Sequence, residues 1–217
     1  MKEKLSKIRR PETEDASLAV SIIASVTAVI AGLAIGIAVK ALQFMAANST
    51  VWWQDFIGEL QLDVVFNKFP VWFLFGLAVA VWSWTPLKAA INEFLFFLGV
   101  TAGFILAPSV VPGLTSAATP TIWFIITVLS PVAAYIFWYA KSQSWPSILF
   151  DIIIIGLMGA YMFDCGFLYL HPGDFVTDAL NGVILLLIFI VLASGVIQFL
   201  LTLVGGILLA LALGPVI

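Results

Sequence analysis

The chain has 217 residues, of which 63% are hydrophobic and 10% are charged, and its formal net charge at pH 7 is −3. Soluble domains are nearer half apolar and a quarter charged, so this composition excludes an ordinary soluble enzyme, and the lack of a basic stripe argues against nucleic-acid binding. Several runs of about 18 or more nearly uncharged residues predict an all-α fold, a polytopic bundle of transmembrane helices.

The N-terminus is basic and then polar, reading KEKLSKIRR over 2–10 and PETEDAS over 11–17. The apolar run that follows, 17–40, is longer than the hydrophobic part of a signal peptide and has no clear cleavage site, so it predicts a retained first span. We therefore divide the chain into a cytoplasmic tail, 1–16, and a single transmembrane domain, 17–217.

The stretch after the first span predicts an amphipathic helix outside the membrane. Over 50–65, apolar side chains recur at helical spacing, whereas Asp55, Glu59 and Asp63 share another face. One interpretation is an interfacial connector with a solvated acidic face. The functional interpretation is a lid or an element that contacts a partner.

Further apolar runs predict the remaining spans. They cover about 70–85, 87–107, 120–140, 147–170, 179–194 and 197–215. The last two come from one uncharged tract that is too long for a single span, so we expect a break near Ser194-Gly195. Pro131 should kink its span. Seven spans are our first expectation, and six, with a tilted or partly interfacial last helix, are the alternative.

Basic residues favour one side of the membrane if the spans alternate. Lys88 and Lys141 then share a side with the basic N-terminus, and only Lys40 and Lys68 fall on the other. Cytoplasmic loops carry an excess of lysine and arginine, so the pattern predicts a plasma-membrane protein with its N-terminus inside.

Small residues at four-residue spacing predict close packing between helices. They are Ala24, Ala28, Gly32 and Gly36 in the first span, Gly99 and Gly103 in the third, and Gly156 and Ala160 in the fifth. Lipid gives helices little hydrophobic reason to associate, so close backbone approach matters. We expect these seams to pack the bundle or a homo-oligomer, and the alternative is a docking seam for a partner subunit.

A polar group is expected near the inner surface. Thr85 and Pro86 have the pattern of a helix start, which places Glu93 about 10 Å along the axis. Asp151 lies at a similar depth in another span. The predicted inner pocket comprises Lys88, Asn92, Glu93 and Asp151. A structural tie at the interface is the favoured interpretation, and a shared pocket for proton coupling is the functional one.

A second polar group is expected at the outer surface. It comprises Tyr161, Asp164, His171, Asp178 and Asn181. With the acidic loop above it, this outer mouth should be electronegative and suited to a cationic or amine-bearing ligand. Ordinary solvated loop acids with one tied aspartate are an equally good interpretation.

The sequence offers no support for a metal, a cofactor or catalysis. The adjacent residues Asp164 and Cys165 cannot share a helical face, and His171 is the single histidine. Serine–histidine–acid, HExxH and phosphate-loop patterns are missing. We therefore expect no enzyme, no metal site and no cofactor.

Residues 69–106 read FPVWFLFGLAVAVWSWTPLKAAINEFLFFLGVTAGFIL. An apolar helix, a Ser/Pro turn, a basic residue, paired alanines and a Phe-rich helix follow one another. This order resembles small polytopic bacterial membrane proteins of unknown function, which implies a compact bundle of about six spans and no particular activity.

The Ala24-xxx-Ala28 motif and the long first outer loop give a looser similarity, to the substrate-binding membrane subunits of energy-coupling-factor transporters. This similarity implies a motif that docks on a scaffold subunit and a loop that acts as a lid.

These observations predict an integral membrane protein that binds or transports a small solute, with a cation favoured, as the membrane subunit of a multi-component transporter. The alternative is an accessory, immunity or assembly protein that acts through helix–helix contacts with another membrane protein.

Overall fold

The computed structural model describes residues 8–9, 18–48, 51–59, 65–66, 68–114, 121–163, 165–166, 169–170 and 175–214. The helices in these parts are α2 (Leu18–Ala47), α3 (Trp52–Glu59), α5 (Phe69–Val81), α6 (Pro86–Val110), α7 (Thr121–Phe137), α8 (Trp145–Phe163), α9 (Phe175–Leu192) and α10 (Val196–Leu213). β1 (Cys165–Gly166) and β2 (Tyr169–Leu170) form a short antiparallel pair in which Cys165 faces Leu170. The fold is therefore all-α, as predicted.

Apolar helices make this an integral membrane protein. In the described part of the chain, five helices are long and apolar enough to cross a membrane, namely α2, α6, α8, α9 and α10. The apolar helices α5 and α7 are shorter, with 13 and 17 residues.

Two predicted boundaries are confirmed. Thr85 caps α6, because its side chain accepts a hydrogen bond from the backbone N–H of Lys88 at 3.2 Å, and Pro86 takes the first helical position. The long uncharged tract breaks between Leu192 and Val196, where Gly195 has an extended backbone and precedes α10.

Other helices differ from the predicted ranges or are described only in part. α2 continues past 40 to Ala47, because the sequence after Lys40 stays mostly apolar and contains no proline or glycine. The Lys40 ammonium lies 5.4 Å from the centre of the Phe104 ring. α8 ends at Phe163 instead of 170, since β1 and β2 follow it. The outer helix α3 ends at Glu59, and residues 60–64 lie outside the described residues.

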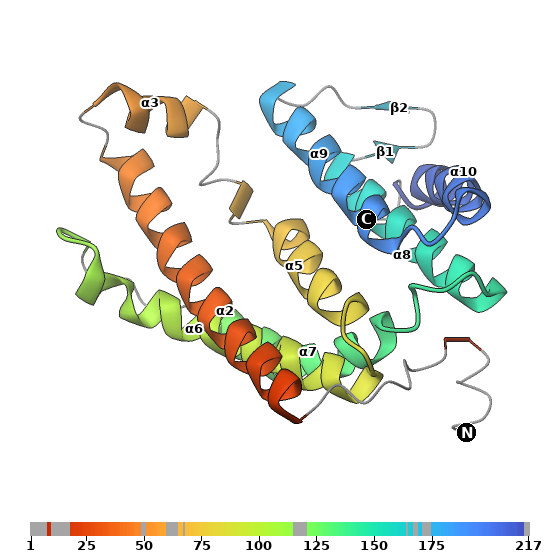
Figure 1. The fold of residues 1–217 in the computed structure, drawn as a ribbon. Coiled ribbons are helices and arrows are strands. Elements are labelled where there is room, and N and C mark those ends of the chain that lie inside the picture. Colours follow the sequence, from red (N-terminus) through yellow and green to blue (C-terminus); the bar gives the residue numbers. More distant parts are fainter. Residues whose placement is uncertain are drawn as a thin grey trace.

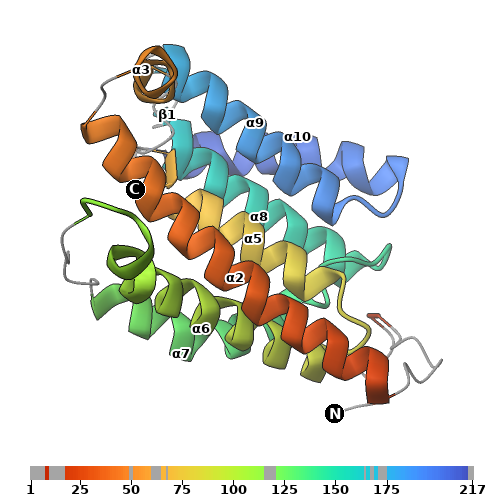
Figure 2. The same ribbon diagram turned by 60° about the vertical axis from the view of Figure 1, so that its left-hand side comes forward.

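The helices form two groups joined by α5. α2 packs on α6, and α7 packs on the same helix; α8 packs on α9 and α10 (Figures 1 and 2). α5 contacts α6, α7 and α9, so it lies between the groups. Leu77, Ala80 and Val81 of α5 are fully buried. The shortest of the apolar helices is therefore the central one.

Glycines bring α2 and α6 into backbone contact. Gly32, Gly36, Gly99 and Gly103 all lie where a methyl group would collide with the backbone of the facing helix. A methyl group added to Gly32 would lie 2.1 Å from the carbonyl oxygen of Phe96, and one added to Gly99 would lie 2.3 Å from that of Val29. These glycines therefore pack α2 against α6 inside the bundle. Of the two alanines in the same seam, Ala28 packs against a core cluster and Ala24 is half-buried.

A second close approach joins α8 to α10. A methyl group added to Gly156 would lie 2.7 Å from the Leu209 side chain, and one added to Gly206 would lie 2.6 Å from Ile155. Ala160, in the same seam of α8, is 3% exposed.

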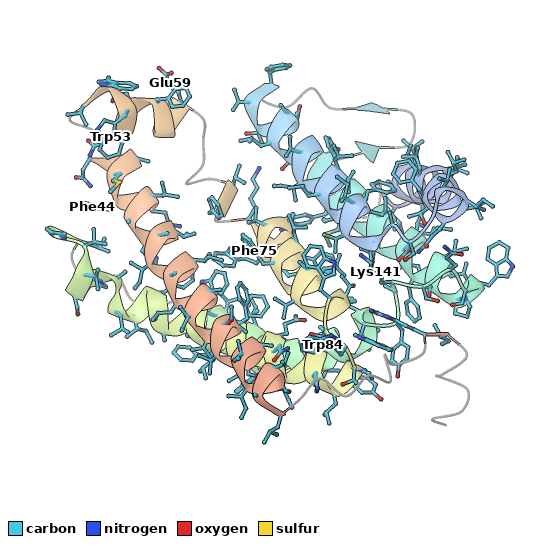
Figure 3. All side chains as sticks on the ribbon, viewed as in Figure 1. Phe44, Trp53, Glu59, Phe75, Trp84 and Lys141 are labelled. Atoms are coloured by element: carbon cyan, nitrogen blue, oxygen red, sulfur yellow. The ribbon has the colours of Figure 1, made fainter. Side chains whose placement is uncertain are left out.

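The connections gather at two opposite ends of the bundle. Figure 3 shows Trp84 and Lys141 at one end and Trp53 and Glu59 of α3 at the other. We name the first the basic end. It holds Ile8 and Arg9 and the turns 82–85, 138–144 and 193–195.

Arg9 closes the basic end over two helices. Its guanidinium donates to the carbonyl oxygen of Trp138 at 2.7 Å and to that of Val81 at 3.0 Å. The same group lies 4.2 Å from the centre of the Trp138 ring. The ring nitrogen of Trp138 donates to the Ser83 carbonyl oxygen at 2.6 Å. The N-terminal segment is thereby fixed to the ends of α5 and α7; of the predicted tail 1–16, the other residues lie outside the described part.

The turn after α7 is also tied to the end of α9. The Lys141 ammonium donates to the Val191 carbonyl oxygen at 2.9 Å, and the Gln143 amide donates to that of Ser194 at 2.8 Å. Burial, and then the positive charge of Arg9, lower the pKa of Lys141 from its usual value. Both helix groups therefore meet at the basic end.

Candidate functional site

Glu93 is a buried carboxyl group, and among the described residues one of its oxygen atoms lacks a hydrogen-bond partner. It lies two turns into α6, at the predicted depth of about 10 Å from the helix start. Its side chain is 3% exposed, and the Oε2 atom has no hydrogen-bond partner among the described residues. Such groups are costly in a protein interior, so an unpaired one indicates a function.

A glycine on the central helix makes room for this carboxyl group. A methyl group added to Gly76 of α5 would lie 2.8 Å from Glu93 Oε1 and 3.2 Å from the Phe97 ring. Any larger residue at this position would therefore displace the carboxyl group or the ring.

Glu93 and Gly76 line a cavity of about 290 Å³ between α5, α6 and α7. The other lining residues are Phe69, Trp72, Phe73, Phe97, Ile122, Ile125, Ile126, Leu129, Ser130, Ala133 and Phe137. Most are apolar, and Glu93 is the only acidic or basic residue among them. The hydroxyl group of Ser130 donates to the Thr127 carbonyl oxygen at 3.0 Å, so Glu93 supplies the free polar atom. We name this space the Glu93 cavity.

The Glu93 cavity opens on the surface of the bundle. Phe69, Ile122 and Leu129 line it and are 47%, 52% and 59% exposed. The opening is therefore bordered by exposed apolar side chains of α5 and α7. Two aromatic pairs bridge α5 and α7: the Trp72 and Trp123 rings lie 4.7 Å apart and the Phe73 and Phe137 rings 5.2 Å apart.

Asn92 and Lys88 do not line the Glu93 cavity. The Asn92 amide oxygen accepts from the Ser25 hydroxyl of α2 at 2.9 Å, and its nitrogen lies 3.5 Å from the Ser83 hydroxyl. The Lys88 ammonium lies 5.4 Å from the centre of the Trp84 ring. Asn92 therefore ties α6 to α2, and Lys88 lies by the turn that precedes its helix.

Glu93 and Asp151 line different spaces, so the shared pocket that was the functional alternative is not formed. Asp151 of α8 is 1% exposed and accepts a hydrogen bond from the Gln198 amide of α10. Glu93 instead faces Gly76 of α5. Similar depth did not bring the two carboxyl groups together, because α6 and α8 pack against different neighbours.

The predicted outer site is described only in part. Asp164 and His171 lie outside the described residues. Tyr161 is 52% exposed, and Asp178 lies in the first turn of α9. Asn181 is buried, and its amide donates to the Met162 carbonyl oxygen at 2.8 Å. Asn181 therefore ties α9 to α8.

Four residues that the sequence analysis did not single out lie around the two buried carboxyl groups, Glu93 and Asp151. They are Gly76, Ser130, Gln198 and Thr202. Gln198 and Thr202 carried a signal, since they are the only polar side chains in the apolar helix α10 and lie one turn apart. No sequence pattern distinguishes Gly76 and Ser130 from residues that only pack the helices.

Comparisons with known protein families, with curated protein sequences and with solved structures found no match to this chain. In the part of the chain that the structure describes, no three His, Cys, Asp or Glu side chains lie close enough to hold a metal ion together.

Proposed function

We propose that this protein binds a small hydrophobic amine or similar organic cation in the Glu93 cavity and moves it across the membrane. The observation that carries the proposal is the unpaired Oε2 atom of Glu93 beside a mostly apolar cavity. An ammonium group supplies both the hydrogen-bond donor and the positive charge that this oxygen lacks.

The walls and the opening support the same class of ligand. Aromatic and aliphatic side chains surround the carboxyl group and suit an apolar body. The exposed lining residues Phe69, Ile122 and Leu129 suit entry from the lipid phase. This site replaces the outer mouth as the preferred place for a cationic ligand.

The alternative role, as an accessory protein acting through its helix seams, has less support. Gly32 and Gly36 lie against the backbone of α6 and leave no free glycine seam there for a partner subunit. A solute-binding role is therefore the one proposed.

Binding of octylamine and of 1-octanol, a neutral molecule of similar length, tests the proposal on protein in lipid nanodiscs. The wild type should bind octylamine more tightly. Glu93→Gln should weaken octylamine binding about 10-fold to 100-fold and leave 1-octanol binding unchanged, because a hydrogen bond to a charged group contributes about 1.5–3 kcal/mol. Saturable binding of the radiolabelled compounds, measured above their partition into protein-free nanodiscs, is a suitable signal.

Glu59→Gln is the matched control, since it removes an exposed carboxyl group far from the cavity. It should leave the binding of both compounds unchanged. An equal affinity of the wild type for octylamine and 1-octanol would contradict the proposal. An equal loss of both in Glu93→Gln would show a packing role for the carboxyl group.

The proposed arrangement is seven spans in the plasma membrane with the N-terminus inside, α5 and α7 being counted as spans. Arg9, Lys88 and Lys141 all lie at or beside the basic end, which supports a cytoplasmic position for that end.

Labelling with a membrane-impermeant maleimide in whole cells tests this orientation. In a Cys165→Ser background, Trp52→Cys on α3 should react in intact cells, whereas Trp82→Cys at the basic end should react only after permeabilisation. Both positions are exposed, at 79% and 65%, so accessibility to the reagent differs only by side of the membrane. The reverse pattern would invert the proposed orientation.

A further inference from the structure

The carboxyl group of Glu93 lies towards one end of the Glu93 cavity. α5 and α7 end at the basic end of the bundle, and α6 begins there. Glu93 is seven positions after the first residue of α6, and Gly76, which it contacts, is five positions before the last residue of α5. Ser130 is seven positions before the last residue of α7. All three therefore lie about 8–10 Å along their helices from the basic end, at what we name the carboxyl level.

Most of the cavity lining lies beyond the carboxyl level, on the side away from the basic end. On α5 and α6 the lining residues beyond this level are Phe69, Trp72, Phe73 and Phe97. On α7 they are Ile122, Ile125, Ile126 and Leu129. Phe69 and Gly76 are seven positions apart, so this part of the cavity extends about 10 Å towards the end of the bundle that carries α3 (Figure 3). We name this part the apolar arm and that end of the bundle the α3 end.

The cavity has little lining on the side of the basic end. The residues there are Ala133 and Phe137 of α7. The Phe137 ring lies 5.2 Å from the Phe73 ring, so an aromatic pair joins α7 to α5. A ligand whose charged group contacts Glu93 therefore finds most of the remaining space on the other side, along the apolar arm.

The apolar arm suits a hydrocarbon tail. The polar atom among its side chains is the ring nitrogen of Trp72, which donates to the Phe66 carbonyl oxygen at 2.8 Å. At the α3 end of the arm, Phe69 and Ile122 are about half exposed, so the arm is open there. An open end sets no limit on the length of a tail. One carboxyl group and one apolar arm match a molecule with one charged head and one tail.

We propose that the ligand of the Glu93 cavity is a single-chain amphiphilic amine, bound with its ammonium group at Glu93 and its alkyl tail along the apolar arm towards the α3 end. This inference rests on the proposed function and specifies the class and the orientation of the ligand. The ammonium group donates to the unpaired Oε2 atom. The tail lies between α5 and α7 and leaves the cavity between Phe69 and Ile122. A compact amine would leave the arm unfilled.

Photochemical labelling of the full-length protein in lipid nanodiscs tests the orientation. Two diazirine derivatives of dodecylamine serve as probes, one with the diazirine at the end of the tail and one with it next to the amine. Fragment-ion mass spectrometry locates the labelled residues, and only labelling that excess dodecylamine suppresses is counted. We expect the tail probe to label the segments around Phe69 and Ile122, and the head probe to label those around Glu93 and Ser130.

The opposite order of labelling would overturn the inference. In that case the tail probe would label the segment around Ala133 and Phe137, and the head probe the segments around Phe69 and Ile122. Equal labelling of all these segments by both probes would overturn it as well, because the ligand would then have no fixed orientation. Either pattern, if it depends on Glu93, leaves the proposed function standing, so the two can fail separately.

Two variants assign the labelling to the carboxyl group. Glu93→Gln should lower the suppressible labelling by the tail probe about 10-fold, because a hydrogen bond to a charged group is lost. Glu59→Gln, outside the cavity, should leave this labelling unchanged. The tail probe reacts far from Glu93, so a lower signal reports weaker binding and not the loss of a reactive side chain. An undiminished signal in Glu93→Gln would contradict the proposed function and, with it, this inference.

Discussion

Replacing Trp138 with alanine is expected to lower the free energy of unfolding by about 3–5 kcal/mol. The Trp138 side chain is 1% exposed and is the largest of the fully buried side chains among the described residues. Its loss leaves a void between α5 and α7, and the Ser83 carbonyl oxygen loses the donor that lies 2.6 Å away. The guanidinium of Arg9 also loses the ring that it faces at 4.2 Å.

Reversible unfolding in mixed micelles with increasing SDS measures this change. Trp145→Ala is the control. Trp145 is 67% exposed, so its replacement should lower the free energy of unfolding only slightly. Trp138→Phe should lose less than Trp138→Ala, since it keeps most of the volume but no ring N–H. A Trp138→Ala variant as stable as Trp145→Ala would contradict the structure of the basic end.

Adding one methyl group at Gly32 or Gly99 is expected to destabilise the protein by about 1–3 kcal/mol. In Gly32→Ala the new carbon would lie 2.1 Å from the Phe96 carbonyl oxygen, and in Gly99→Ala it would lie 2.3 Å from that of Val29. The clash is with backbone, so α2 and α6 must move apart. The double variant should cost less than the sum of the two, because the first substitution already separates the helices.

Gly182→Ala provides a matched control for the α2–α6 contact. Gly182 lies in α9, and a methyl group there would meet nothing within 4 Å. Alanine is the better helix former by up to about 1 kcal/mol, so this variant should be as stable as the wild type or slightly more stable. The same unfolding measurement applies. A loss in Gly182→Ala as large as that in Gly32→Ala would show that the α2–α6 contact is not specific.

Local signals in the sequence predicted where several helices begin and end. Thr85-Pro86 combines a capping side chain with a residue suited to the first turn, and both act within the same few residues. Ser194-Gly195 was predicted as a break because the apolar tract is too long for one span. The strand pair after Phe163 was not predicted, since its two-residue strands have no alternating pattern.

The neighbours of the buried carboxyl groups were beyond what the sequence alone predicts. Helix geometry gave the depth of Glu93, but α6 and α8 are apolar on every side and so do not indicate which face meets which helix. The functional alternative therefore placed Asp151 in one pocket with Glu93, although the hydrogen-bond partner of Asp151 is Gln198 on α10. The Glu93 carboxyl group lies against Gly76 because α5 and α6 approach closely there. A glycine in the sequence does not by itself show which helix approaches it.

The short central helix has a consequence for how the protein responds to its lipid. The 13 residues of α5 extend about 20 Å, less than the bilayer hydrocarbon thickness of about 30 Å. α5 contacts α6, α7 and α9, so protein covers much of it. Hydrophobic mismatch in a thinner or thicker bilayer therefore acts mainly on peripheral helices such as α2. The side of the Glu93 cavity that α5 forms should therefore respond less to membrane thickness than α2 does. If so, the affinity for the ligand proposed above should vary less between short-chain and long-chain lipids than the stability of the bundle does.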